Sequence, residues 1–312
     1  MNRTPNTQPT PGLVSVIMNC LNCEEYVREA IDSVYAQTYQ NWEIIFWDNA
    51  STDKSSAIAE LYDSRLKYRR GKKTIPLGAA RNLAIKEASG EFIAFLDCDD
   101  LWMPEKLEKQ VPLFSDRDVV LVYSDTIFFD NAGMRRRIYA TRPYYTGHCF
   151  ASLLSDYCLS METVIIRRKA LDGLGTWFDE RFNMIEEADL FRRLAYNGKL
   201  EMINEALAMW RVHSNSWTSR QPMAFGEETE IMLESYVVLY PDFEKQYANE
   251  ISALRRGITF SQAKLLWQKG EGRKARRALR GHVLSPRCAA LYVLTLLPRV
   301  LGQKLLAVAN RG

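Results

Sequence analysis

The stretch Gly90-Glu-Phe-Ile-Ala-Phe-Leu-Asp-Cys-Asp-Asp100 joins a short apolar run to a cluster of carboxylates. Residues 92–96 have the length and composition of a strand that is buried in a parallel sheet. Directly after them come Asp97, Asp99 and Asp100. Open α/β sheets bind ligands at the carboxyl ends of their strands. The cluster therefore predicts either a polar turn or a site for a hard divalent cation, Mg²⁺ or Mn²⁺.

Apolar runs and helical spacing alternate before this stretch. Expected strands cover 13–18, 43–47 and 66–69, and expected helices cover 24–37, 51–62 and 78–88. This alternation predicts a Rossmann-like α/β fold, with a mixed, mostly parallel sheet and helices on both faces. The second expected strand also ends in a polar segment that begins at Asp48.

The pattern changes along the second half of the chain. We expect a helix over 104–114, strands over 119–123 and 163–166, a helix over 186–196 and an extended segment over 206–212. From about Phe225 the pattern is helical to the end. We therefore expect a flexible N-terminal tail over 1–12, an α/β domain over 13–224 and a helical region over 225–312.

The overall composition is that of a soluble globular protein. Hydrophobic residues make up 47% of the 312 residues and charged residues 25%. Six cysteines are too few for a disulfide scaffold. Cys20 and Cys23 form a CxxC, but no second pair stands at ligand spacing, which favours packing thiols over zinc ligands. The first dozen residues are polar and Pro-rich, so we expect no signal peptide and a cytoplasmic location.

The C-terminal region is strongly basic. Residues 251–312 contain thirteen lysines and arginines but one acid, so they carry a net charge of +12 and the rest of the chain −9. The most apolar run, 288–297, is shorter than the ~20 residues that cross a bilayer. We expect the region to bind an anionic membrane surface; the alternative is a helical cap on the α/β domain. No nucleic-acid-binding module accompanies it, so no nucleic acid partner is expected.

Five segments in a fixed order resemble one enzyme family. They are Val14-Ser-Val-Ile-Met-Asn-Cys-Leu-Asn22, Trp47-Asp-Asn-Ala-Ser-Thr-Asp53, Gly78-Ala-Ala-Arg-Asn82, the stretch 90–100 and Leu101-Trp-Met-Pro-Glu-Lys-Leu107. This series resembles the family 2 glycosyltransferases of GT-A fold, and the resemblance covers about residues 12–217. It implies that residues 13–224 form a catalytic domain for an inverting enzyme that uses nucleotide-diphosphate sugars.

The resemblance assigns donor-binding roles residue by residue. Asp97 and Asp99 match the DxD motif, with Asp99 the expected direct metal ligand. Arg81 matches the position near the pyrophosphate, and its fork of donors suits that task; a helix salt bridge is the alternative. The remaining expected donor contacts are Asn22, Asp48 and Asn49. The family has a second acid where this chain has Asn49, so the residue that meets the base stays open.

The expected catalytic base is Glu187. The segment Asn183-Met-Ile-Glu-Glu-Ala-Asp-Leu-Phe-Arg-Arg-Leu194 resembles the acidic motif of the family, with Glu187 at the position of the base. Glu186 and Asp189 lie beside it, and neighbouring carboxylates raise one another's pKa. The alternative is that these acids favour the first turn of a helix.

A later segment completes the expected site. Met209-Trp-Arg-Val-His-Ser-Asn-Ser-Trp217 resembles the family segment that carries an arginine and a histidine. The resemblance implies that Arg211 reaches the phosphates and that His213 reaches the metal. Trp102 and Trp217 are expected either as walls of the sugar or acceptor site or as core residues.

The function implied is metal-dependent, inverting, non-processive transfer of a hexose, with a UDP-sugar as donor. The acceptor expected is a hydroxyl of a glycan or lipid-linked oligosaccharide in surface polysaccharide assembly, on the inner face of the plasma membrane. A processive synthase would need transmembrane helices and a Gln-x-x-Arg-Trp motif. The alternative from another class is a non-catalytic nucleotide- or glycan-binding module on the same fold.

Overall fold

The computed structural model describes residues 8–130, 132–213 and 224–297. The chain divides into two compact units. The first comprises the residues up to Leu153 and those from Tyr157 to Ser216, and the second comprises Leu154–Asp156 and the residues from Trp217 onward.

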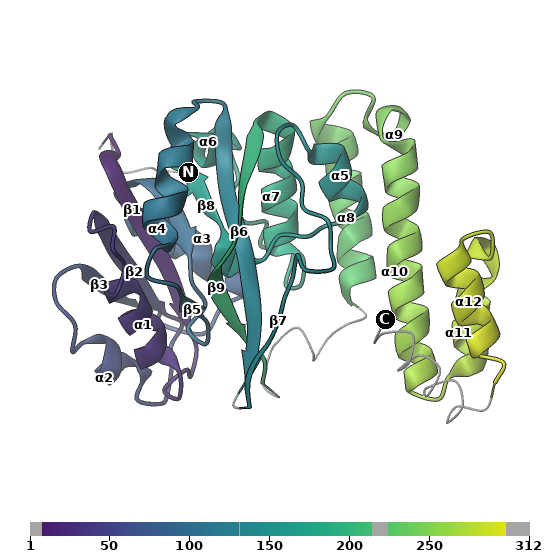
Figure 1. Cartoon of the computed structure of the whole chain (residues 1–312), viewed down its shortest axis with the longest axis horizontal. Helices are drawn as coiled ribbons and strands as arrows, with labels where there is room; N and C mark the ends of the chain where they lie inside the picture. The colour runs from purple at the N-terminus through teal and green to yellow at the C-terminus, as the bar shows by residue number, and fades with distance from the viewer. Residues whose placement is uncertain (1–7, 131, 214–223, 298–312) are drawn as a thin grey trace. The chain divides into compact units, whose positions relative to one another are not determined.

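A nine-stranded sheet runs through the described part of the first unit (Figure 1). In spatial order its main path is β3 (Leu66–Arg70), β2 (Trp42–Asp48), β1 (Thr10–Cys20), β4 (Gly90–Phe95), β8 (Ile165–Arg167), β6 (Val119–Asp130), β9 (Lys199–Arg211) and β5 (Leu101–Trp102). The strands β3, β2, β1 and β4 are parallel, as are β6 and β9. β8 is antiparallel to both neighbours. The prediction of a mixed, mostly parallel sheet is confirmed.

Helices cover both faces of the sheet. Successive side chains of a strand point to opposite faces, so an apolar strand packs against helices on both sides. On one face, Ile31 of α1 (Val27–Tyr35) packs in one cluster with Val16 and Met18 of β1. On the other face, Phe95 of β4 meets Phe191 of α7 (Glu186–Asn197), with ring centroids 6.4 Å apart. The other helices of this unit are α2 (Ser55–Ala59), α3 (Leu77–Glu87), α4 (Lys106–Gln110), α5 (Phe150–Ser155) and α6 (Arg168–Gly173), with 3₁₀ turns at Val111–Ser115 and Met161–Thr163.

Two expected boundaries are wrong. β1 begins at Thr10, whose N–H donates to the Ser89 carbonyl (2.9 Å), so residues 10–12 belong to the sheet and not to a tail. β6 continues to Asp130 and pairs with β7 (Gly133–Arg137), where the sequence indicated a strand over 119–123. The extension contains the fully buried Asp125, which pairs with Arg137 of β7 (2.6 Å). The charged Asp125 can therefore lie in a buried strand, because its partner Arg137 is on the neighbouring strand β7.

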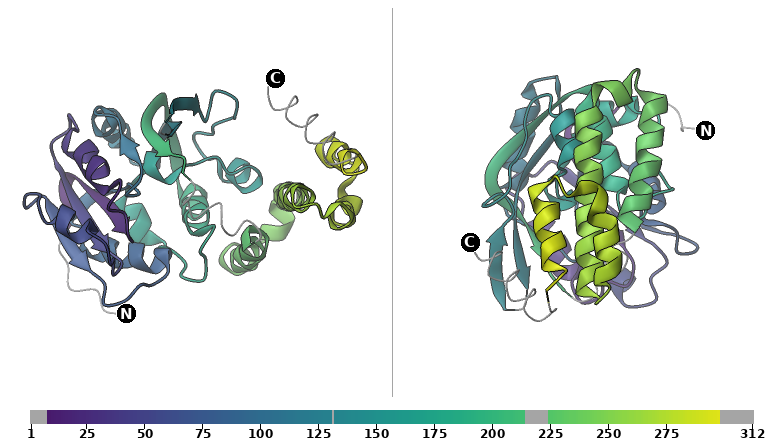
Figure 2. Two further views of the ribbon diagram at one scale, coloured as in Figure 1. Left: turned by 90° about the horizontal axis from the view of Figure 1, so that it is seen from below. Right: turned by 90° about the vertical axis from the view of Figure 1, so that its right-hand side faces the viewer.

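The described part of the second unit is helical, which confirms the predicted C-terminal helical region. Its helices are α8 (Ala224–Leu239), α9 (Phe243–Gln246), α10 (Ala248–Gln268), α11 (Gly272–Leu279) and α12 (Pro286–Leu294), with a 3₁₀ turn at Arg280–His282. Trp267, Leu279 and Leu291 form the core where α11 and α12 pack beside α10 (Figure 2). In the residues that the structure describes, no helix has the length and apolar character needed to cross a bilayer.

Gly90, the first residue of β4, is expected to tolerate no side chain. A Cβ at this position would lie 2.5 Å from the Leu13 carbonyl oxygen and 2.8 Å from the Ser15 nitrogen, and backbone atoms of a paired strand cannot move aside. We expect Gly90→Ala to lower the free energy of unfolding by about 1–3 kcal/mol in urea denaturation. Gly257→Ala in α10 is the control, because nothing lies within 4 Å of its added Cβ. Equal midpoints would contradict the packing argument.

Candidate active site

The carboxyl ends of β1, β2 and β4 form one edge of the sheet. Cys20, the last residue of β1, is in register with Asp48, the last residue of β2. β4 leads directly into Asp97 and Asp99. The parallel strands therefore bring the polar segments of three expected motifs to one place, as the sequence predicts.

Asp48 is fully buried and its carboxylate is used within the chain. Its oxygens accept hydrogen bonds from the Ser51 N–H (2.7 Å) and the Tyr68 hydroxyl (2.7 Å) and pair with Arg70. Arg70 also donates to the Ser51 carbonyl (2.6 Å). These bonds fix the conformation of the loop after β2. In this structure Asp48 therefore orders the loop that the predicted nucleotide donor would contact.

The two predicted asparagines also fasten loops. Asn22 has a left-handed backbone (φ 57°), and its side-chain oxygen accepts from the Thr52 N–H (2.8 Å). The Asn49 amide donates to the Ile75 carbonyl (2.8 Å) and accepts from the Ile75 N–H (3.1 Å). Both residues lie at the expected edge, where they hold the loops after β1, β2 and β3 together.

Asp99 and His213 are adjacent although 114 residues separate them. The His213 Nε2 lies 2.9 Å from the Asp99 carboxylate. The Asp97 and Asp99 side chains are 40% and 34% exposed, so ligands from solvent reach them. Burial, and then the charge of Asp97, raise the pKa of Asp99. The two carboxylates offer oxygen donors of the kind that binds Mn²⁺ or Mg²⁺. Asp100, by contrast, is buried and accepts the Arg211 N–H (2.8 Å).

Arg81 joins the aspartate cluster to α7. Its buried guanidinium is 3.1 Å from the Asp97 carboxylate and 3.0 Å from that of Glu186. Arg81 is thus a buried bridge between two carboxylates and not a surface salt bridge of its helix.

Glu187 differs from its neighbour Glu186 in its surroundings. Burial raises its pKa to about 8, and the charge of Glu186 adds to the rise. Glu186 is engaged by Arg81, whereas no hydrogen bond joins the Glu187 carboxylate to another described residue. A carboxylate with a pKa near neutrality matches the requirement for a general base.

Arg211 holds the DxD turn against β9. Its Nε donates to the Asp99 carbonyl (2.8 Å), and its NH2 pairs with Glu29 (2.6 Å). The guanidinium carbon lies 4.5 Å from the ring centres of both Tyr26 and Phe129. Two of the three guanidinium nitrogens that the sequence assigned to the phosphates are therefore engaged within the chain.

Trp102 lies in the core, one of its two expected places. It is buried, and its Nε1 donates to the Glu162 carbonyl (2.8 Å). The buried Lys106 donates to the next carbonyl, that of Thr163 (3.1 Å), and burial lowers its pKa to about 7. These two residues therefore fasten the 160–163 segment behind the site. Trp217 lies outside the described residues.

Sequence reasoning missed two polar residues of the site. Glu162 is buried, accepts the Ser160 hydroxyl (2.7 Å), and its charge contributes to the raised pKa of Glu187. It stands in a segment without a recognisable motif. Both amide atoms of Asn19 are buried without a hydrogen-bond partner among the described residues. Asn19 lies near the end of β1. A buried amide without a hydrogen-bond partner is unusual and marks a candidate binding residue, but it can be recognised only in a structure.

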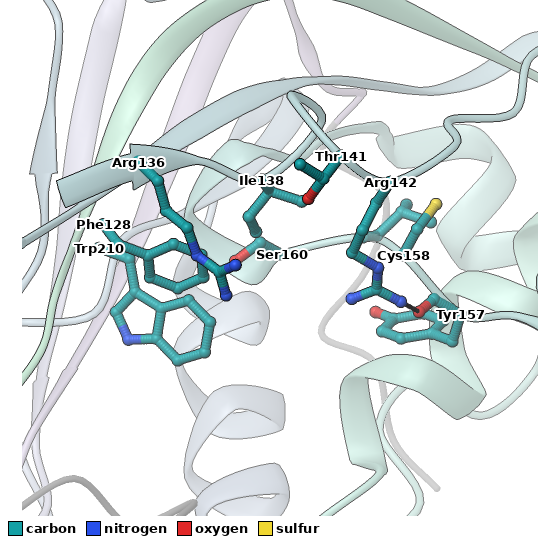
Figure 3. Close-up of a pocket in the computed structure, with 10 residues that line it drawn as sticks. Phe128, Arg136, Ile138, Thr141, Arg142, Tyr157, Cys158, Ser160 and Trp210 are labelled. Carbon is teal, nitrogen blue, oxygen red and sulfur yellow. Dashed lines mark hydrogen bonds between the residues drawn. The ribbon is translucent and has the colours of Figure 1, made fainter. Parts of the chain in front are cut away.

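A pocket of about 200 Å³ is lined by residues of β6, β7 and β9 and of the segments 138–142 and 157–160 (Figure 3). Aromatic rings and arginines dominate its lining. Phe128 and Trp210 lie with ring centroids 5.0 Å apart, and the Arg136 guanidinium lies 5.5 Å from the Phe128 ring centre. Two lining residues adjoin residues described above, since Trp210 precedes Arg211 and the Ser160 hydroxyl donates to Glu162 (2.9 Å). The other lining residues are Ile138, Thr141, Arg142, Tyr157, Cys158 and Leu159.

The chain belongs to glycosyl transferase family 2, whose model matches residues 15–175. It is 34% identical over 161 residues to the Escherichia coli protein named UDP-Glc:alpha-D-GlcNAc-diphosphoundecaprenol beta-1,3-glucosyltransferase WfgD, covering 51% of this chain and 62% of WfgD. It is 41% identical over 127 residues to the putative glycosyltransferase EpsE of Bacillus subtilis, covering 39% of this chain and 46% of EpsE. The chain thus spans less than two thirds of both relatives.

Solved structures share the fold. S. aureus TarS 1–349 in complex with UDP-GlcNAc superposes with a TM-score of 0.64 at 20% identity, covering 90% of each chain. The mannosyltransferase PcManGT from Pyrobaculum calidifontis, in complex with GDP-Man and Mn²⁺, superposes with a TM-score of 0.62 at 18% identity, covering 96% of this chain and 86% of that one. At these identities the likeness is one of fold.

Proposed function

We propose that this chain transfers a sugar from a UDP-sugar to a hydroxyl of a lipid-linked diphosphate acceptor in surface polysaccharide assembly. The observation that carries the proposal is the meeting of Asp97, Asp99 and His213 with the Arg81–Glu186–Glu187 group at one sheet edge. The family membership supports sugar transfer, and the similarity to the glucosyltransferase WfgD supports UDP-glucose and a lipid-linked acceptor.

The metal site of the proposal consists of Asp99, Asp97 and His213. The carboxylate oxygens suit Mn²⁺ or Mg²⁺, and PcManGT, of the same fold, was solved with Mn²⁺. Bound there with a diphosphate, the cation would supply positive charge to the leaving group. Arg81 neutralises part of the negative charge of this cluster, so that the aspartates can share one edge.

The proposed reaction is a single displacement. The Glu187 carboxylate accepts the proton of the acceptor hydroxyl, whose oxygen forms a bond to the anomeric carbon as the bond from that carbon to the diphosphate oxygen breaks. Attack opposite to the leaving group inverts the anomeric configuration, and no covalent enzyme intermediate forms. Since the pKa of Glu187 is about 8, the fraction of active base rises with pH across the neutral range.

The acceptor would occupy the aromatic pocket. Trp210 and Phe128 offer apolar faces for a sugar ring, and Arg136 and Arg142 offer charge for a diphosphate. Both side chains are exposed, but Arg142 donates to the Tyr157 carbonyl (3.0 Å), whereas the Arg136 guanidinium lies over the Phe128 ring. Arg136 is therefore the side chain that we assign to the phosphate groups of the acceptor.

Arg136→Ala is expected to raise the KM for a lipid-linked diphosphate acceptor about tenfold, because one charge-assisted hydrogen bond is lost. The KM for the donor should stay unchanged. Steady-state kinetics with each substrate varied in turn checks this. Arg117→Ala is the matched control, because Arg117 is an exposed arginine just before β6 begins, at the end opposite to Phe128. An Arg136 variant with the acceptor KM of wild type would refute the assignment.

The C-terminal region would bind the anionic inner face of the plasma membrane. Leu284 is 99% exposed and Val283 44% exposed in the turn between the 280–282 segment and α12. Arg280 and Arg287 flank this apolar turn in the sequence. An exposed apolar tip with basic neighbours is the arrangement expected of an interfacial element.

Leu284→Asp is expected to reduce co-sedimentation with phosphatidylglycerol vesicles at least tenfold, since it places a negative charge at the tip that enters the interface. Binding to phosphatidylcholine vesicles should be weak for all variants. Val238→Asp in α8 is the control, because Val238 is 86% exposed but lies on a different helix. Equal loss in both variants would show that the tip has no special role.

The proposed function is tested by incubating the full chain with UDP-glucose, Mn²⁺ and a synthetic N-acetylglucosamine-diphospho-lipid. We expect an acceptor that has gained one hexose, with the glycosidic bond inverted relative to the donor in the NMR spectrum. GDP-mannose in place of UDP-glucose tests the donor class. Retention of configuration would exclude the single displacement, and absence of any transfer with tight nucleotide binding would favour a binding module.

A further inference from the structure

Three cysteines from separate segments meet behind the aspartate cluster. Cys20 ends β1, Cys23 precedes α1, and Cys98 stands between Asp97 and Asp99. Their sulfur atoms all lie within 4.8 Å of one another. Cys20 is 1% and Cys98 2% exposed, whereas Cys23 is half-buried. The fold therefore completes the CxxC with a third thiol from 75 residues further along, which sequence spacing did not reveal.

The spacing of the three sulfurs fits a single ion. Zinc–sulfur bonds of ~2.3 Å place the sulfurs of a tetrahedral site ~3.8 Å apart. The observed spacing of at most 4.8 Å closes to that value with small side-chain rotations. Three neighbouring thiols are also a donor set that binds soft cations more tightly than hard ones.

The surroundings of the cluster support a held site. The Cys98 thiol donates to the Asn19 carbonyl (3.4 Å), and the Cys20 sulfur lies 3.8 Å from the buried Ser51 hydroxyl. The Cys23 N–H donates to the Ser55 hydroxyl (2.9 Å). The Cys98 and Cys20 sulfurs thus each contact a polar group, as the ligands of metal sites commonly do, and the backbone of Cys23 is fixed by Ser55.

We propose that Cys20, Cys23 and Cys98 form a Zn²⁺ site distinct from the hard cation site of Asp97 and Asp99. The three thiols lose their protons as three Zn–S bonds form, and the half-buried Cys23 side leaves the fourth position to water. In the turn 97–99, the two aspartates would then serve the hard cation and Cys98 would serve Zn²⁺. An ion held by the sulfurs would tie the ends of β1 and β4 together where the donor site is built.

Binding is tested on the full chain after treatment with a reductant and a chelator. We expect one equivalent of Zn²⁺ to bind in competition with a chromophoric chelator. We also expect one equivalent of Co²⁺ to produce the near-ultraviolet absorption of thiolate-to-cobalt charge transfer. Cys23→Ser should weaken Zn²⁺ binding at least tenfold and reduce that absorption, because one of three thiolates is lost. Cys149→Ser and Cys288→Ser are matched controls, since both residues are buried free thiols outside the cluster.

Two further measurements keep the test decisive. Thermal unfolding of the metal-free Cys23→Ser protein should match wild type, because the half-buried position tolerates serine; Cys98→Ser is the second ligand variant. Asp99→Asn should leave the cobalt–thiolate absorption unchanged, which separates this site from the aspartate site. The proposal is overturned if wild type binds Zn²⁺ no more tightly than Cys23→Ser, or if the Cys149 control loses as much binding.

Discussion

Glu187→Gln is expected to lower the rate of sugar transfer by a factor of about 10²–10⁴, the usual contribution of a general base. Donor affinity should stay within twofold of wild type, because the substitution removes one proton acceptor and leaves the aspartate cluster intact. Single-turnover transfer and equilibrium binding of UDP measure the two quantities separately. Glu60→Gln, an exposed glutamate after α2, is the control. Unchanged turnover in Glu187→Gln would exclude Glu187 as the base.

The same residue predicts two pH dependences. Since the folded-state pKa of Glu187 is raised to about 8, the transfer rate of wild type should rise with pH up to about that value. The raised pKa also means that protonation of Glu187 stabilises the fold at low pH, and that this stability is lost as pH rises through about 8. Glu187→Gln stays neutral, so its unfolding temperature should exceed that of wild type above pH 8 and match it below pH 4.

Arg81→Met is expected to lower the free energy of unfolding by about 3–5 kcal/mol, the cost of removing one partner from a buried ion-pair group. The guanidinium side chain is 4% exposed and pairs with Asp97 and Glu186 at once, so its loss removes a buried positive charge that two carboxylates share. Urea denaturation measures the change. Metal-dependent donor binding should also weaken, since Arg81 positions the DxD turn.

Two further variants show how the free energy of unfolding lost in Arg81→Met divides between charge and geometry. Arg81→Lys keeps the charge but loses the fork that reaches both carboxylates, so an intermediate loss is expected. Arg255→Met removes an exposed pair with Glu230, whose side chains are 50% and 48% exposed, and should cost below about 1 kcal/mol. A loss for Arg81→Met as small as that for Arg255→Met would mean that the bridge adds little to stability.

The N-terminal half of the fold was predictable because its strands are short, apolar and separated by amphipathic helices. Each feature there is local: β2 was expected over 43–47 and covers Trp42–Asp48. The second half depends on pairings across the chain. β7 contains three consecutive arginines and no strand signal of its own, and it forms because β6 offers an edge to pair with.

In the candidate site, too, local features were predictable and long-range contacts were not. Motif order led to Asp99 and His213, which the fold places 2.9 Å apart. The detailed use of each side chain was beyond the sequence, because it depends on distant partners. Arg211 is occupied by Glu29, 182 residues away, and Cys98 meets a CxxC 75 residues earlier. Residue type indicates what a group can bind, whereas packing decides which partner it has.

The most direct test of the proposed site is a calorimetric titration of UDP into wild type and Asp99→Asn, each with and without Mn²⁺. We expect tight binding by wild type with Mn²⁺, at least tenfold weaker binding without the metal, and no metal effect in Asp99→Asn. At a hundred times the dissociation constant, UDP should also stabilise wild type by ~2.7 kcal/mol. Equal metal-dependent affinity in wild type and Asp99→Asn would contradict the assignment of this cluster as the metal-held donor site.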